Sequence, residues 1–151
     1  MRPYLFYAML AGVCWGIGGY FEKVGLKTLA IPPIAGITIR SAVAMLLLGL
    51  LSIPAWRSFT SPPGETSAWL MIIIGGGIVA GSLGMWSFYS SLATSENLAV
   101  TLAIAFSLSP VAGTAVGLVR GDQPLELKTA LGLLAIVGGI VLVQLGREPA
   151  H

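Results

Sequence analysis

The fold is decided by residues 66–119, which read TSAWLMIIIGGGIVAGSLGMWSFYSSLATSENLAVTLAIAFSLSPVAGTAVGLV. This stretch carries a single charged residue, Glu96, which separates two apolar runs at residues 68–92 and 97–119. Each run is long enough to cross the hydrocarbon layer of a bilayer, ~30 Å thick, which takes about 20 helical residues. The pattern therefore predicts a membrane hairpin, with one helix across, a tight turn at residues 93–96 and one helix back.

The composition of the whole chain agrees with a membrane protein. Of its 151 residues, 56% are hydrophobic and 9% are charged, whereas soluble domains have roughly 25% charged residues. The net charge of +2 comes without a basic cluster, which argues against nucleic acid as a partner. One cysteine, Cys14, and one histidine, His151, argue against a zinc site or a Ser-His-Asp centre. We expect no enzyme activity, no metal and no cofactor.

Three further apolar runs complete a predicted all-α protein with five membrane-spanning helices. The run after Arg2 also resembles a signal peptide, but Glu22 and Lys23 follow it in place of a cleavage site, so we interpret it as a span. The expected single domain, residues 1–151, has spans at about residues 3–21, 32–53, 68–92, 97–119 and 129–145. For the first span, a continuation to Lys27 is the alternative. Glycine pairs such as Gly12 and Gly16 would allow close helix packing, although glycine is also simply common in membrane helices.

The balance of basic residues gives little preference for either orientation. Five spans place the termini on opposite sides, with four Lys or Arg residues on the N-terminal side and three on the C-terminal side, Arg40 aside. The positive-inside rule needs a clear excess to fix orientation. The count slightly favours an N-terminus inside, and the near-tie also allows the chain to insert both ways. Our hypothesis is that two copies then pair antiparallel into an inverted repeat.

The order of several short motifs resembles the EamA-type domain of the drug/metabolite transporter superfamily. Each motif is weak alone, but together they extend from about Tyr4 to Gly146, nearly the whole chain. They are Trp15-Gly16 with Lys23 in the first span, Arg40 in the second, Trp86-x-x-Tyr89-x-x-Leu92-Ala93 closing the third, Pro110 in the fourth, Gly121-Asp122 where such domains usually have Gly-Glu, and Leu131-Gly132 with Gly138-Gly139 in the last.

This resemblance implies a five-helix unit that transports small metabolites or drugs, commonly by export. It also implies a multi-pass protein of the prokaryotic plasma (inner) membrane. Most such transporters carry two of these units in one chain, inverted relative to each other, whereas this chain carries one. We therefore expect a homodimer to complete the architecture, with a small-molecule substrate bound near the bilayer midplane and alternating access around it.

Two residues lie deep within their spans. Trp15 is eleven residues past Tyr4, roughly 16 Å along the helix, and so is no interfacial anchor. It would either pack in the bundle or stack on a substrate. Arg40 is the sharpest candidate, because a charge within a span is costly and usually faces protein or water. Its alternative is a lipid-facing side chain that reaches the interface, roughly 12 Å above.

The third span offers a binding wall. Ser82, Met85, Trp86, Tyr89 and Ser90 share one helical stripe by their spacing, and the aromatic members combine π-faces with polar groups. An interfacial aromatic belt is the alternative for Trp86 and Tyr89.

Glu22 is a candidate for proton coupling, but its position, roughly 27 Å beyond Tyr4, favours a solvated or Arg40-paired carboxylate. In the fourth span, Pro110 lacks the N–H that would bond to the carbonyl of Phe106 and is expected to kink the helix.

The sequence thus predicts a substrate site made by Trp15, Arg40, Trp86 and Tyr89 in a membrane transporter. Three rivals remain. A lipid-carrier flippase would use Arg40 to attract a phosphate headgroup. A channel needs a continuous polar path, which these apolar spans do not favour. A non-transporting scaffold has little need of a costly intramembrane cation.

Overall fold

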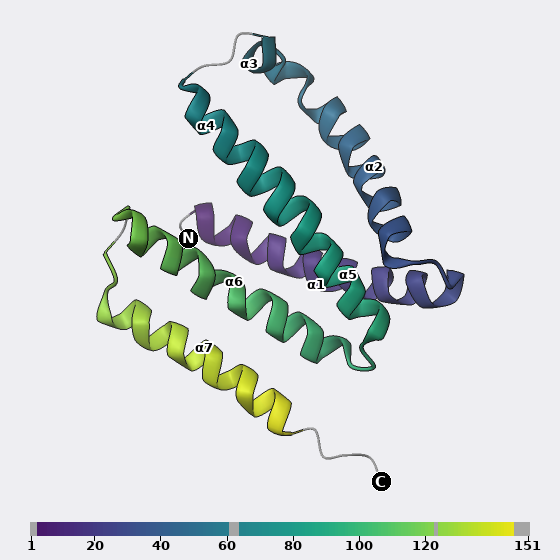
Figure 1. Ribbon diagram of the computed structural model, residues 1–151, viewed down its shortest axis with the longest axis vertical. Helices are drawn as coiled ribbons and strands as arrows, with labels where there is room; N and C mark the ends of the chain where they lie inside the picture. The colour runs from purple at the N-terminus through teal and green to yellow at the C-terminus, as the bar shows by residue number, and fades with distance from the viewer. Residues whose placement is uncertain (1–2, 61–63, 123, 147–151) are drawn as a thin grey trace. The chain divides into compact units, whose positions relative to one another are not determined.

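The computed structural model describes residues 3–60, 64–122 and 124–146, and every regular element among them is helical (Figure 1). Within these residues, five helices are long and apolar enough to cross a membrane. They are Pro3–Leu29, Pro33–Leu51, Thr66–Thr94, Leu98–Arg120 and Leu127–Leu145. Helices satisfy their own backbone hydrogen bonds, which is what a spanning segment requires in lipid.

The elements follow the order of the five predicted spans. Helix Thr66–Thr94 is made of three consecutive segments, and two short helical pieces lie between the second and third spans. The bounds are α1 Pro3–Leu29, α2 Pro33–Leu51, η1 Ile53–Ala55, α3 Arg57–Thr60, α4 Thr66–Leu70, η2 Met71–Gly84, α5 Met85–Thr94, α6 Leu98–Arg120 and α7 Leu127–Leu145.

The first helix is longer than the expected span of residues 3–21. It continues through Glu22 and Lys23 to Leu29, because charged residues do not end a helix and the first strong breaker is the pair Pro32-Pro33. At 27 residues it is about 40 Å long, more than the hydrocarbon thickness. Glu22 therefore lies on a helix face, where it can meet a neighbouring helix.

The connections between spans show ordinary helix-end chemistry. Asn97 caps α6 by accepting hydrogen bonds from the backbone N–H groups of Ala99 and Val100, at 3.0 and 3.4 Å. Gly121 ends the same helix in the left-handed conformation, with φ of 73°. The segment between the second and third predicted spans contains the short helix α3, and Pro62 and Pro63 lie outside the described residues.

The segment η2 is a π-helix of 14 residues, where the sequence predicts a regular α-helix. Such helices are rare and usually last one turn. Ser82 follows the wider winding, since its hydroxyl donates a 3.1 Å hydrogen bond to the carbonyl of Gly77, five residues back. The predicted stripe from Ser82 to Ser90, which assumed α-helical spacing, is therefore interrupted at Gly84.

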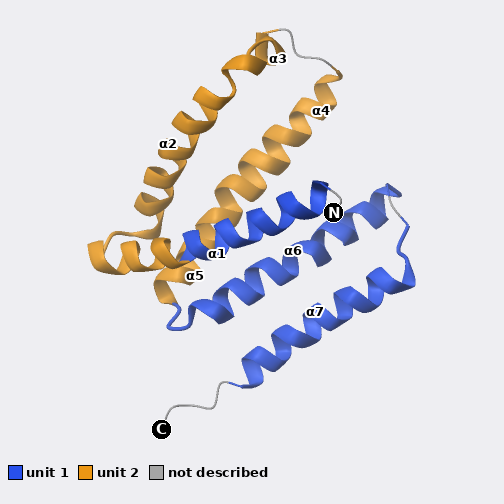
Figure 2. Cartoon of the chain, turned by 180° about the vertical axis from the view of Figure 1, so that it is seen from behind, with its two compact units in different colours: residues 1–19, 95–151 blue, residues 20–94 orange. Residues whose placement is uncertain are grey.

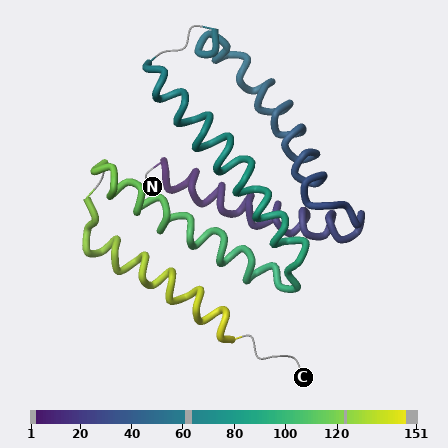
Figure 3. The backbone as a smooth tube through the Cα atoms, in the orientation of Figure 1, coloured from purple at the N-terminus to yellow at the C-terminus, as the bar shows by residue number. Residues whose placement is uncertain are grey.

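The chain divides into two compact units (Figure 2). The first comprises residues 1–19 and 95–151, in which α6 and α7 pack side by side and run in opposite directions (Figure 3). The second is Tyr20–Thr94, in which α2 packs against α5. Few side chains are buried, and most large apolar side chains are exposed, as membrane-spanning helices require.

Candidate functional site

The candidate site begins with a glycine that allows three helices of the second unit to meet. A Cβ atom built on Gly36 in α2 would lie 2.7 Å from Cδ2 of Leu26 in α1 and 3.1 Å from Cε1 of Tyr89 in α5. Both distances are well below the roughly 3.5–4.0 Å of an ordinary carbon contact. Gly36 therefore lets α1 and α5 approach α2 more closely than any side chain would allow.

One turn further along each helix, the same faces carry opposite charges. Glu22 is four residues before Leu26, and Arg40 is four residues after Gly36, so each pair shares a helix face. Nε of Arg40 lies 2.9 Å from Oε1 of Glu22. The structure thus has the Arg40-paired form of Glu22, and the Arg40 guanidinium is held by a protein carboxylate. This pairing offsets the cost of placing either charge within a membrane-spanning helix.

Tyr89 completes the cluster. Its ring packs against Gly36, its side chain is only 2% exposed, and its hydroxyl hydrogen-bonds to the Glu22 carboxylate. A phenol donates to an ionised carboxylate, so Glu22 is held by two donors, one on α2 and one on α5. Glu22, Arg40 and Tyr89 therefore form one polar network that links three helices.

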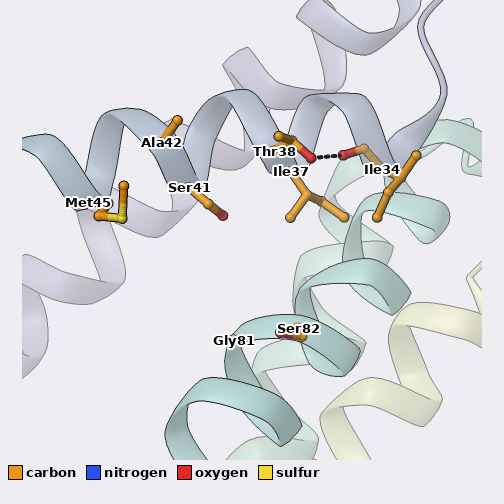
Figure 4. A pocket seen from close by; sticks show the side chains of 8 residues that line it. All are labelled: Ile34, Ile37, Thr38, Ser41, Ala42, Met45, Gly81 and Ser82. Carbon is orange, nitrogen blue, oxygen red and sulfur yellow. Dashed lines mark hydrogen bonds between the residues drawn. The ribbon is translucent and has the colours of Figure 1, made fainter. Parts of the chain in front are cut away.

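A cavity of about 390 Å³ lies on the adjoining face of α2. Figure 4 shows Ile37 and Ser41 pointing from α2 toward the segment that carries Gly81 and Ser82. The walls are mostly apolar and are formed by Ile34, Ile37, Ala42, Met45 and Gly81. Three hydroxyl groups, those of Thr38, Ser41 and Ser82, also line the cavity. The hydroxyls of Thr38 and Ser82 donate to carbonyls of their own helices, at 2.9 and 3.1 Å. The cavity is open rather than enclosed, and its volume lies within the range of small-molecule pockets.

The structure places the other predicted residues outside this network. Trp15 lies in the first unit, where its ring stacks on Phe106 with centroids 5.6 Å apart and planes 8° apart, and 56% of the residue is exposed. Trp86 lies on α5 of the second unit and is 54% exposed. Pro110 lies within α6, which continues as one helix to Arg120. Of the four predicted substrate-binding residues, Arg40 and Tyr89 are brought together.

Among the described residues, no group of three or more His, Cys, Asp or Glu side chains could hold a metal ion. The side chains of the described site offer charge, hydrogen bonding and apolar contact. Such groups bind and orient a solute.

The family of the chain follows from its sequence as a whole. The model of the EamA-like transporter family matches residues 2–145. The chain belongs to the EamA-like transporter family. No curated protein and no solved structure matches it. The EamA domain is the domain of the drug/metabolite transporter superfamily, and with its five spanning helices this EamA-like protein is an integral, multi-pass membrane protein.

Two parts of the candidate site of this EamA-like protein could not be predicted from the sequence. Gly36 belongs to no glycine pair, and its signal is its position four residues before a charged residue on the same face. In the predicted pair Gly12 and Gly16, a Cβ atom added to either glycine would meet nothing within 4 Å. The cavity hydroxyls on α2, Thr38 and Ser41, carry no signal that separates them from ordinary polar residues in a span.

Proposed function

We propose that the protein exports small organic solutes across a prokaryotic plasma membrane, and that Arg40 is central to its substrate site. One observation carries this proposal: the network of Glu22, Arg40 and Tyr89 lies within membrane-spanning helices, beside a cavity of about 390 Å³. Charged residues within spans usually mark solute or ion pathways. A pair that served only to join helices would have no need of the neighbouring cavity.

The aromatic residues extend this proposal. Trp15 and Trp86 leave more than half of their surface exposed, and an exposed aromatic face within a span suits stacking on an organic solute. In this proposal they join Arg40 and Tyr89 in the working transporter. Substrate binding in the span region and alternating access around it are the pattern of transporters built from inverted repeats.

The assembly that we propose is a homodimer of antiparallel copies. The chain supplies one five-helix unit, and its four basic residues on one side against three on the other allow both orientations. Two copies inserted in opposite directions would supply the inverted repeat from a single sequence.

Uptake into proteoliposomes with a panel of labelled metabolites tests the proposal. We expect both Arg40→Ala and Trp15→Ala to lower uptake of the transported solute. For Arg40→Ala the loss should be about tenfold or more, since a hydrogen bond to a charged group contributes ~1.5–3 kcal/mol. Arg120→Ala is the matched control, because Arg120 also places Nε 2.9 Å from a carboxylate, that of Asp122, but does so at an exposed helix end.

Folding of each variant is followed by helical circular dichroism and by size-exclusion chromatography in detergent. Uptake that is unchanged in both folded variants would remove the proposed site. Absence of transport by the folded wild-type protein across the whole panel would remove the proposed function.

A further inference from the structure

We propose that Arg40 receives the oxyanion of a solute, a carboxylate or phosphate group, and that Glu22 is the internal anion with which this solute competes. The inference rests on the proposed function and names the substrate class of the same site. It begins with the unequal way in which the two charges are used.

Arg40 has more donors than its partner uses. A guanidinium carries five N–H donors in a planar fork, and a carboxylate or phosphate matches that fork with two parallel hydrogen bonds. The contact with Glu22 engages Nε. Between residues 3 and 146, leaving aside 61–63 and 123, Glu22 is the one ion-pair partner of Arg40. The two terminal amino groups are thus available to a second oxyanion.

The accessible member of the pair is the cation. The side chain of Arg40 is 39% exposed and that of Glu22 is 20% exposed. An incoming anion therefore meets the guanidinium, while the carboxylate is the more enclosed group. A pair that attracted a cationic solute would present these exposures the other way round.

Glu22 keeps a second hydrogen bond when an anion competes for Arg40. The Tyr89 hydroxyl, which is nearly buried, bonds to the Glu22 carboxylate from α5. Glu22 thus has two roles: it neutralises Arg40 when the site is empty, and it limits the affinity of the solute when the site is full. A transporter needs this limit, because a solute that binds too tightly does not leave.

The lining of the adjoining cavity indicates the chemistry of the rest of the solute. Ile37 lines the cavity and lies three residues before Arg40, so the two side chains are neighbours on the surface of α2. The apolar walls and the hydroxyl of Ser41 suit an organic body with some polarity. The expected solute is an amphipathic organic anion, with its oxyanion at Arg40 and its apolar part against Ile37.

A binding experiment on purified protein in neutral detergent tests this directly by titration calorimetry. The probes share one aromatic body and differ in charge: N-acetylphenylalanine is an anion, its amide is neutral and phenylalanine amide is a cation. Inorganic phosphate is the bare oxyanion. We expect the wild-type protein to bind the two anions and to bind neither of the other probes.

Substitutions at the pair separate the two roles. Glu22→Gln removes the competing charge and keeps an acceptor for Tyr89, so the anions should bind about tenfold more tightly, as when a blocked fraction of sites becomes competent. Arg40→Gln should abolish anion binding. The double variant Glu22→Gln/Arg40→Gln leaves neither member of the pair as a charge without its partner and should also fail to bind, which separates loss of the site from loss of folding. Asp122→Asn and Arg120→Gln alter the exposed pair and should change nothing.

Repeating the titrations in vesicles identifies the source of the anion. In phosphatidylcholine vesicles the soluble anions should bind as in detergent. If phosphatidylglycerol in the vesicles abolishes their binding to wild type and to Glu22→Gln, the oxyanion is that of a lipid headgroup.

Anion binding that is equal in wild type, Glu22→Gln and the double variant would overturn the inference, as would tighter binding of the cation. Transport of metabolites by a protein that binds no anion at Arg40 would overturn this inference and leave the proposed function intact. Anion binding at Arg40 without transport of any solute would support the anion site and overturn the proposed function.

Discussion

Arg40 shows how far single residues can be interpreted from sequence. Its position in an apolar run predicts a partner or a pathway, and Glu22 is predicted as a possible partner. Distances along the two helices place both residues toward the same side of the membrane, and the structure joins them at 2.9 Å.

The role of Tyr89 could not be predicted in the same way. Trp86 and Tyr89 are both aromatic residues of the same predicted stripe, yet Trp86 is 54% exposed and Tyr89 only 2%. The difference is made by Gly36 on another helix, which lets the Tyr89 ring approach α2. A contact between helices that are distant in sequence leaves no trace in the periodicity of either one.

Tyr89→Phe tests the network at the scale of one hydroxyl group. The ring and its contact with Gly36 remain, while Glu22 loses one donor. We expect the thermal unfolding midpoint in detergent to fall, with a loss of about 0.5–1.5 kcal/mol in the free energy of unfolding. Tyr20→Phe is the control, because Tyr20 is exposed. Equal midpoints for both variants would show that the hydroxyl of Tyr89 contributes nothing.

At the scale of elements, the five helices could be predicted because each span is a long apolar run with a clear end. Helix α1 ends at Leu29, two residues past the longer of the two ends that the sequence allows, since charge is a weaker stop than the following prolines. The π-helical winding of η2 could not be predicted. It changes which carbonyl each N–H or hydroxyl reaches, and the apolar residues around Gly75, Gly76 and Gly77 look the same in either winding.

Gly36→Ala tests the meeting of α1, α2 and α5. The added methyl group would lie 2.7 Å from Cδ2 of Leu26 and 3.1 Å from Cε1 of Tyr89, so these side chains must shift. We expect a loss of about 1–3 kcal/mol in the free energy of unfolding, as for other overpacked sites. The change is measured by denaturant unfolding in mixed micelles.

Gly49→Ala is the matched control on the same helix, because a Cβ atom there meets nothing within 4 Å. Its stability should be unchanged or slightly raised, since alanine favours a helix over glycine. If the Gly36 and Gly49 variants were equally stable, the close approach at Gly36 would be unimportant for packing.

At the scale of the whole molecule, membership of the EamA-like transporter family indicates a transporter. The five spans form one unit, and in our proposal a second copy supplies the inverted unit. The numbers of Lys and Arg residues on the two sides of the membrane are nearly equal, so substitutions at a few loop positions should be enough to change the orientation.

Reporter fusions at the C-terminus test this balance. We expect the wild-type chain to give signals from both sides of the membrane. Ser58→Lys with Thr60→Lys adds two positive charges to the N-terminal side, raising the count there from four to six, and should leave one orientation with the N-terminus inside.

Ser58→Gln with Thr60→Gln is the uncharged control and should keep both signals. A wild-type chain that reports from one side alone would rule out insertion in two directions. The antiparallel homodimer would then be ruled out with it.

The one cysteine has a practical consequence for measuring assembly. Cys14 is exposed on α1 and is the only thiol in the sequence. A nitroxide attached to it through an apolar reagent would mark every copy at a single, identical point without any engineered substitution. Pulsed electron spin resonance would then read the spacing between neighbouring copies in native-sequence protein, as one sharp interval for a closed pair and as a featureless decay for solitary chains.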